Sequence, residues 1–226
     1  MKDIFKDMSL NQKASGFLNT LISISLLILL KIIGKIFFRL KARGIENIPL
    51  PPYIIAPNHA SYLDGFVIAA SVPIKSFMNL YFLALQEFFN NWFTAYFAKV
   101  AHVIPMEPKT HLRKAIQISG YILKQGNAIC IFPEGGITDN GSILPFKKGI
   151  GMLSKEVDVP ILPCLIQGTF EALPRGAAFP RFKKIIVAFG KPLYQSEIDF
   201  AKKPENMDDY EWIAFNARRK VLEMKS

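Results

Sequence analysis

Cysteine, histidine and tryptophan are scarce in this sequence of 226 residues, which contains two cysteines, three histidines and two tryptophans. Cys130 and Cys164 both lie inside apolar runs and have no metal-type spacing. This pattern argues against a disulfide scaffold and favours buried free thiols in a reducing compartment. The histidines form no His-Glu-x-x-His or equivalent pattern, so we predict no metal ion.

Acidic residues are also few: 18 Asp and Glu stand against 28 Lys and Arg, which gives a net charge of +10. Such a charge suits nucleic acid or an anionic bilayer, but no helix-turn-helix, zinc-knuckle or RNP-like pattern accompanies it. Half of the residues are apolar and 19 are phenylalanine, which is more apolar surface than a soluble core of this size normally needs. We therefore expect membrane lipids as partners and no nucleic acid.

No internal repeat, low-complexity tract or long linker interrupts the chain, and its length suits one sizeable domain. Short apolar runs alternate with helical patterns, which predicts an α/β fold: a single layered domain with a mixed central sheet flanked by helices. We expect this domain at 45–226, after an N-terminal membrane-associating helical segment at 1–44. The expected strands are Tyr53–Ala56, Phe77–Phe82, His102–Pro105, Ala128–Phe132, Ile161–Ile166 and Lys184–Phe189. The expected helices are Tyr62–Ala70, Glu87–Lys99, Leu112–Gln125, Lys148–Val157 and Tyr210–Met224.

The N-terminal segment carries no charge from Ala14 to Leu30, and three interpretations compete. A cleaved signal peptide fits poorly, because basic residues rather than a small-residue cleavage site follow the apolar run. A single transmembrane span is possible at the minimum length. We favour a helix lying in the membrane interface, with Lys31, Lys35 and Arg39 as a cationic stripe; a helix packed on the domain stays open. Without cleavage, the domain would face the cytoplasm, at the inner membrane in a bacterium.

A histidine and a carboxylate follow the first expected strand, in residues 58–64, Asn-His-Ala-Ser-Tyr-Leu-Asp. His59 is suited to act as a general base and Asp64 as the group that orients it, which is what an alcohol nucleophile requires. A second interpretation is structural, because Ser61 and Asp64 also fit the capping box of a helix. The segment alone does not decide between the two.

A second motif, Phe-Pro-Glu-Gly-Gly at 132–136, follows the expected strand Ala128–Phe132. Loops at the carboxyl edge of a sheet usually present ligand contacts, and this one carries Glu134 in a glycine-rich turn. Taken alone it is ordinary turn chemistry. At this distance from the His-Asp segment, the two motifs together indicate one active site.

With both motifs, the chain from about Ile45 to Leu193 resembles the glycerolipid acyltransferase family, whose members acylate glycerol phosphate and lysophospholipids. The resemblance implies a membrane-associated enzyme of phospholipid biosynthesis that transfers a fatty acyl group from acyl-CoA or acyl carrier protein to the hydroxyl of a lysophospholipid. Lysophosphatidic acid, 1-acyl-sn-glycerol-3-phosphate, is the leading acceptor, and no cofactor is expected besides the acyl donor as co-substrate. The resemblance makes His59 and Asp64 catalytic and assigns Asn58, Glu134 and Gly135 to substrate binding.

Two departures from the family pattern concern phosphate recognition. The family commonly continues the glycine motif with Thr-Arg, but this chain has Gly136-Ile137, and the block at 103–107 also lacks its arginine. Lysines and one arginine could replace the missing guanidinium groups, although each is by default a solvated surface charge. These candidates are Lys109, Arg113, Lys147 and Lys148, of which we assign Lys147 and Lys148 to substrate binding.

Two other functions stay open. The changed glycine motif is reminiscent of relatives that act on lysophospholipids with other head groups. A non-catalytic lipid-binding or membrane-tethering protein would show the same basic, apolar composition. A serine hydrolase is disfavoured, because no Gly-x-Ser-x-Gly segment surrounds Ser61.

Overall fold

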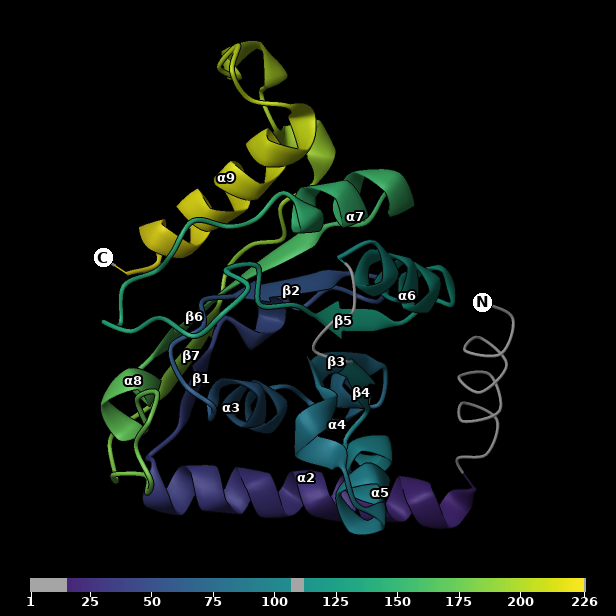
Figure 1. Cartoon of the computed structure of the whole chain (residues 1–226), viewed down its shortest axis with the longest axis vertical. Coiled ribbons are helices and arrows are strands. Elements are labelled where there is room, and N and C mark those ends of the chain that lie inside the picture. The colour runs from purple at the N-terminus through teal and green to yellow at the C-terminus, as the bar shows by residue number, and fades with distance from the viewer. Residues whose placement is uncertain (1–15, 107–111, 226) are drawn as a thin grey trace.

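One seven-stranded sheet forms the centre of the protein in the computed structural model, which describes residues 16–106 and 112–225 (Figure 1). The spatial order of the strands is β1-β7-β6-β2-β5-β3-β4. Neighbouring strands are parallel, except that β6 and β7 are antiparallel, so the expected mixed sheet is confirmed. The strands are β1 Lys41–Arg43, β2 Ile54–Pro57, β3 Leu80–Leu85, β4 Val103–Met106, β5 Ala128–Cys130, β6 Ile161–Gln167 and β7 Ile186–Phe189.

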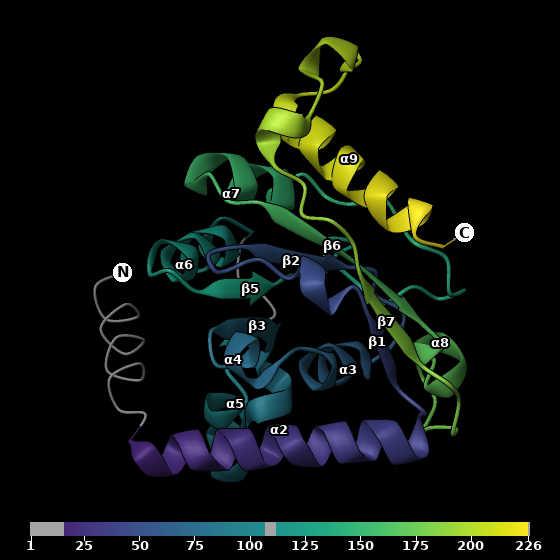
Figure 2. The same cartoon turned by 180° about the vertical axis from the view of Figure 1, so that it is seen from behind.

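Helices cover both faces of the sheet. In both views α6, α7 and α9 lie on one side, and α2, α3, α4 and α5 lie on the other (Figure 2). The helices are α2 Phe17–Phe37, α3 Asp64–Ser71, α4 Ile74–Phe77, α5 Trp92–Val100, α6 Leu112–Lys124, α7 Gly149–Val157, α8 Thr169–Ala172 and α9 Asp209–Glu223. Short 3₁₀ turns are η1 Ile45–Asn47, η2 Gln86–Phe89, η3 Gln195–Glu197 and η4 Phe200–Lys202.

The central strands are apolar throughout because both of their faces are covered. In β2 successive side chains alternate between two separate cores: Ile54 and Ala56 join the core under α6, α7 and α9, whereas Ile55 joins the core above α2 and α3. Cys130 and Cys164 lie in this second core as buried free thiols, as the sequence predicted.

Two expected elements differ from the structure. The strand expected from Phe77 begins at Leu80, because Pro73 precedes the short helix Ile74–Phe77. The single helix expected at Glu87–Lys99 is a 3₁₀ turn followed by α5. Asn91 breaks it by capping the second helix, where its side chain accepts a 2.9 Å hydrogen bond from the Thr94 amide.

The edge strand β1 was not anticipated. Its three residues are polar or small and show no buried face, so they carry no apolar signal. These residues, 41–43, pair with β7 and so belong to the sheet, although they precede residue 45, where we expected the domain to begin. The boundary between the N-terminal segment and the domain stays a prediction. Residues 1–15 of the expected N-terminal segment lie outside the described residues.

Within the described chain, α2 is the one helix long and apolar enough to cross a membrane. It lies along the domain rather than projecting from it, and packs against α3 (Figure 1). Halfway along α2, the Lys31 ammonium donates hydrogen bonds to the carbonyls of Ala70 (2.8 Å) and Val72 (2.7 Å) at the C-terminal end of α3. Cations stabilise helix C-termini, so Lys31 fastens α2 to α3.

The expected cationic stripe on α2 does not form. Lys31 faces α3, and the helix ends at Phe37, before Arg39. The side of α2 that faces α3 buries Ser23, Leu27 and Gly34, whereas the outward side is mainly apolar, with Lys35 exposed near its C-terminal end. The exposed large apolar residues are Phe17, Leu18, Leu21, Ile28, Leu29, Ile32, Ile36 and Phe37. This distribution is opposite to that of a surface helix in water.

The close packing of α7 on α9 gives a test of the fold. A Cβ atom on Gly151 of α7 would collide with the backbone carbonyl of Tyr210, which no side-chain rotation relieves. We expect Gly151→Ala to lower the free energy of unfolding by about 1–3 kcal/mol. Urea denaturation followed by circular dichroism measures this.

Gly120→Ala in α6 is the matched control, because its Cβ would make only ordinary contacts with Val157 and Leu153. Alanine is favoured over glycine inside a helix by about 0.5–1 kcal/mol, so this variant should be as stable as the wild type or more stable. Equal stability of the two variants would contradict the packing of α7 against α9.

Candidate active site

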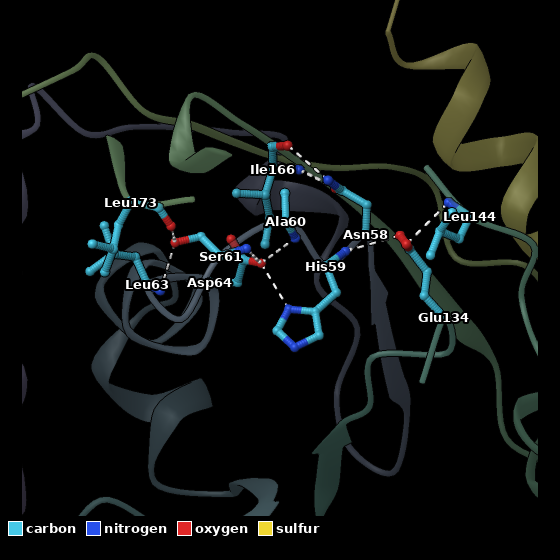
Figure 3. A network of polar contacts seen from close by, with 10 residues as sticks. All are labelled: Asn58, His59, Ala60, Ser61, Leu63, Asp64, Glu134, Leu144, Ile166 and Leu173. Atoms are coloured by element: carbon cyan, nitrogen blue, oxygen red, sulfur yellow. Dashed lines mark hydrogen bonds and ion pairs between the residues drawn. The ribbon is translucent and has the colours of Figure 1, made fainter. Parts of the chain in front are cut away.

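The two motifs meet at the carboxyl edge of the sheet. β2 and β5 are neighbouring parallel strands, so the loops that follow them lie side by side. The His59 amide donates a 3.0 Å hydrogen bond to Glu134 Oε1, and the Thr138 amide donates one of 3.0 Å to the His59 carbonyl. These bonds join the two segments that sequence reasoning assigned to one site (Figure 3).

Asp64 is fully buried, and a single oxygen of its carboxylate receives three donors. Oδ2 lies 2.9 Å from His59 Nδ1 and accepts the amide hydrogens of Ala60 (2.7 Å) and Ser61 (2.8 Å). The carboxylate therefore both contacts the imidazole and closes the turn before α3. The expected capping box does not form, because the residue that caps α3 is Leu63, which has no side-chain hydrogen bond to the helix. Asp64 is also the first residue of α3, where the helix dipole favours a negative charge.

The geometry around His59 suits a general base. Its ring stacks on Phe132 with a centroid distance of 4.0 Å, and its side chain is 20% exposed. Because the carboxylate of Asp64 accepts at Nδ1, the neutral ring carries its proton there and keeps a lone pair on Nε2. This second nitrogen points away from Asp64 and from the other residues drawn (Figure 3).

The two cysteines are buried near Asp64, and both effects favour the protonated thiol. Burial raises the pKa of the Cys130 thiol well above its ordinary value, with further contributions from Cys164 and from the charge of Asp64. Burial and the same carboxylate raise the pKa of Cys164. Since a thiolate is the reactive form, neither cysteine is a candidate nucleophile.

Glu134 is buried, and the protein backbone occupies both of its carboxylate oxygens. Oε1 accepts from the His59 amide, and Oε2 accepts from the Leu144 amide at 3.0 Å. Burial raises the pKa of Glu134, and these two hydrogen bonds partly offset the shift. Glu134 thus fixes the backbone of His59, while its predicted contact with an acceptor stays a prediction.

The side chain of Asn58, like that of Glu134, is hydrogen-bonded to backbone groups of the protein. Its side-chain amide donates to the Ile166 carbonyl (3.0 Å) and accepts from the Ile166 amide (2.7 Å), so it continues the pairing of β2 with β6 beyond the last strand residue. The asparagine holds the chain in register just before His59. Its predicted role in substrate binding stays a prediction.

Gly135 and Lys147 lie against each other. Gly135 has φ +74°, and a Cβ atom at this position would collide with the Lys147 ammonium group. The Lys147 amide also donates a 2.8 Å hydrogen bond to the Pro133 carbonyl. The glycine therefore allows both the turn and the approach of a cation to the loop beside His59.

The neighbouring lysine points elsewhere. Lys148 pairs with Asp208 at 3.1 Å and Glu211 at 3.6 Å near the start of α9, and its hydrogen bond to Asp208 raises its pKa. Of the two lysines assigned to substrate binding, only Lys147 lies over the glycine loop, and both roles stay predictions. Arg113 is exposed on α6, and Lys109 lies outside the described residues.

Several contacts that support the site carried no sequence signal. Ser61 donates from Oγ to the Leu173 carbonyl (2.6 Å) and accepts from the Leu63 amide (3.1 Å), which ties the catalytic turn to the chain after α8. Leu144 contributes only a backbone amide, and Leu173 only a carbonyl. Backbone groups of distant segments cannot be recognised from residue type.

Within residues 16–106 and 112–225, no group of three or more His, Cys, Asp or Glu side chains could hold a metal ion. The acidic groups nearest the catalytic histidine, Asp64 and Glu134, accept hydrogen bonds from backbone amides.

A partly exposed imidazole backed by a buried carboxylate, on the carboxyl edge of an α/β sheet, is the arrangement of an enzyme site that can activate a hydroxyl group. Comparison with known proteins identifies which kind. The model of the family described as Acyltransferase matches residues 39–167, more than half of the chain. The chain belongs to this family, and it is an acyltransferase.

Relatives and one solved structure agree with this assignment. The chain is 28% identical over 202 residues to "1-acyl-sn-glycerol-3-phosphate acyltransferase" of Bacillus subtilis, covering 87% of this chain and 94% of that protein. It is 25% identical to the chloroplast enzyme BAT2 of Brassica napus, covering 72% of this chain but only 47% of that protein. The crystal structure of the 1-acyl-sn-glycerophosphate acyltransferase PlsC from Thermotoga maritima superposes with a TM-score of 0.67 at 25% identity, covering 90% of this chain and 81% of that one.

Asp64→Asn tests how the carboxylate assists His59. An amide oxygen can accept hydrogen bonds but has no charge to stabilise the imidazolium that forms during proton transfer. We expect kcat to fall by about 10⁴-fold, the size seen when the equivalent carboxylate is neutralised in serine proteases. Steady-state kinetics with a lysophospholipid acceptor measures this.

Asp139→Asn provides the matched control, because Asp139 is a highly exposed surface carboxylate paired with Arg175. This variant should keep wild-type kcat. Full activity of Asp64→Asn would show that the buried carboxylate only closes the turn.

Proposed function

We propose that this protein transfers a fatty acyl group from a thioester donor to the free hydroxyl of 1-acyl-sn-glycerol-3-phosphate, and so forms phosphatidic acid for phospholipid biosynthesis. The observation that carries the proposal is the His59–Asp64 pair, in which Nε2 stays available for the acceptor hydroxyl. The names of the Bacillus subtilis, Brassica napus and Thermotoga maritima proteins support the choice of acceptor.

In the proposed reaction, Nε2 of His59 removes the proton of the acceptor hydroxyl as its oxygen attacks the carbonyl carbon of the thioester. Asp64 holds the ring through Nδ1–H and stabilises the imidazolium. The tetrahedral intermediate then collapses, the carbon–sulfur bond breaks, and the imidazolium supplies the proton that the leaving thiolate takes up. The products are the acylated acceptor and free coenzyme A or free carrier protein, and no residue is acylated.

Lys147 is our candidate for the phosphate of the acceptor. Its ammonium group lies over Gly135 in the loop that is hydrogen-bonded to the His59 segment, and the motif lacks the arginine common in the family. A lysine contributes a point charge rather than a two-pronged guanidinium contact. Recognition of phosphate would therefore be less dependent on orientation than in relatives that carry the arginine.

We also propose that the enzyme works at a membrane, on the cytoplasmic face. The outward side of α2 is apolar, and Lys31 holds the middle of this helix along α3. A helix fastened lengthwise to its domain is better suited to lie in the interface than to span the bilayer. The acyl donor, acyl-CoA or acyl carrier protein, would reach the site from the water side.

The missing arginine also favours a second candidate, an acyltransferase for a lysophospholipid with another head group. Both candidates use the same catalytic pair and differ only in the acceptor. A non-catalytic lipid-binding role does not account for a carboxylate buried behind a histidine.

An acceptor panel tests the proposal. Purified protein in anionic vesicles receives labelled palmitoyl-CoA or palmitoyl carrier protein together with lysophosphatidic acid, lysophosphatidylcholine, lysophosphatidylethanolamine or lysophosphatidylglycerol. We expect acylation of lysophosphatidic acid above the other acceptors, and a loss of at least about 10³-fold in His59→Ala. Preference for another acceptor would select the second candidate, and full activity of His59→Ala would refute the mechanism.

Lys147→Gln and Lys148→Gln test phosphate recognition, because these neighbours carry the same charge but point to different places. For Lys147→Gln we expect KM for lysophosphatidic acid to rise about tenfold or more, since a charge-assisted contact is worth about 1.5–3 kcal/mol. Lys148→Gln should leave KM within about twofold, because its partners are exposed acidic residues of α9. Equal effects would indicate general electrostatic attraction instead of a contact.

A further inference from the structure

Two phenylalanines are exposed on the chain between α8 and β7. Phe179 is 83% exposed and Phe182 is 66% exposed, and every side chain from 178 to 184 is exposed. Single exposed apolar residues are common, but a contiguous exposed apolar patch marks an interaction site.

The loop of residues 174–184 reaches the outward face of α2. The Phe182 ring lies 5.3 Å from Phe37 and 6.5 Å from Phe38, at the C-terminal end of that helix. In both views the chain beyond α8 comes down to this end of α2 (Figures 1 and 2). The aromatic residues of the loop thus continue the exposed apolar face of α2.

The same loop is cationic. Arg181, Lys183 and Lys184 are exposed around Phe182, and Lys35 and Arg39 are exposed at the end of α2. Within the described residues, none of these five side chains takes part in an ion pair. Phenylalanines between unpaired cations match a surface with an apolar interior and anionic head groups.

The base of the loop is tied to the catalytic turn. The Leu173 carbonyl accepts the Ser61 hydroxyl at 2.6 Å, and Ser61 donates its amide to Asp64 Oδ2. The Arg181 amide donates to the Ala172 carbonyl at 2.7 Å, which folds the end of the loop back on its start. A surface that holds Phe179 and Phe182 would therefore lie next to the segment that carries His59.

We propose that the 174–184 loop is a second membrane-docking element, which inserts Phe179 and Phe182 into an anionic bilayer while Arg181, Lys183 and Lys184 bind its head groups. This inference rests on the membrane association proposed above and adds to it a docking site outside α2. Two separate contacts fix the orientation of the domain on the bilayer, whereas α2 alone would allow rotation about its axis. The orientation presents the carboxyl edge of the sheet to a lipid acceptor.

Binding of the full-length protein to sedimented vesicles tests the loop. The vesicles are phosphatidylcholine alone, or phosphatidylcholine with about one third phosphatidylglycerol. The loop variants are Phe179→Ser/Phe182→Ser and Arg181→Glu/Lys183→Glu/Lys184→Glu. The matched controls on the far side of the sheet are Phe215→Ser/Leu222→Ser and Lys202→Glu/Arg219→Glu/Lys220→Glu.

We expect the wild type to prefer the anionic vesicles and each loop variant to bind at least about tenfold more weakly, while the controls bind like the wild type. Activity on a short-chain, water-soluble lysophosphatidic acid should be unchanged in the loop variants, which also shows that they fold. Loop variants that bind as tightly as the wild type, or controls that lose as much binding, would overturn the inference alone. A wild type that binds neither kind of vesicle would overturn the membrane association as well, and the activity on the soluble acceptor would still judge the catalytic proposal separately.

Discussion

The active site depends on one buried oxygen atom, Oδ2 of Asp64. It accepts the imidazole of His59 and two backbone amides, so the ring, the turn and the start of α3 share a single anchor. A buried charge needs hydrogen bonds, and here all three come from residues 59–61 to Oδ2, whereas Oδ1 is buried and has no partner within the described residues. The orientation of the His59 ring and the conformation of the loop therefore depend on the same atom. Glu134 is a second buried carboxylate that holds this loop, because it accepts a hydrogen bond from the backbone amide of His59.

The short helix α3 links the catalytic segment to the segment that we place in the lipid interface. Its first residue is Asp64, and the carbonyls at its far end accept the Lys31 ammonium from α2. A helix of eight residues is a stiff connection, so the position of α2 on the domain and the position of the carboxylate are fixed relative to each other. The same polar contact accounts for Lys31, a charged residue that faces the domain from a mainly apolar helix.

Much of this could be predicted from the sequence, because the strands are apolar runs and the two motifs follow their ends. The fold class, the pairing of the motifs in space and the buried thiols depend on residue type and order alone. What could not be predicted depends on backbone groups and on orientation: β1 has no apolar signal, Lys31 looked like part of a cationic stripe, and Lys147 and Lys148 are indistinguishable in sequence. In the last two cases, tertiary contacts decided where a lysine points.

The reversal between β6 and β7, after which β7 and its partner β1 run opposite to the other strands, decides where the chain that links β6 to β7 lies. Because β7 reverses direction, Ile186 at its beginning pairs with Gln167 at the end of β6, and β1 begins at the same level beside it. Residues 168–185 therefore leave and re-enter the sheet at one rim, whereas a parallel crossover would have carried them to the opposite rim. This reversal places the whole excursion at the rim that carries His59, without lengthening any strand. At that rim the excursion meets the turn of Asp64 through the Leu173 carbonyl, so a segment at the surface of the protein is in direct contact with the site.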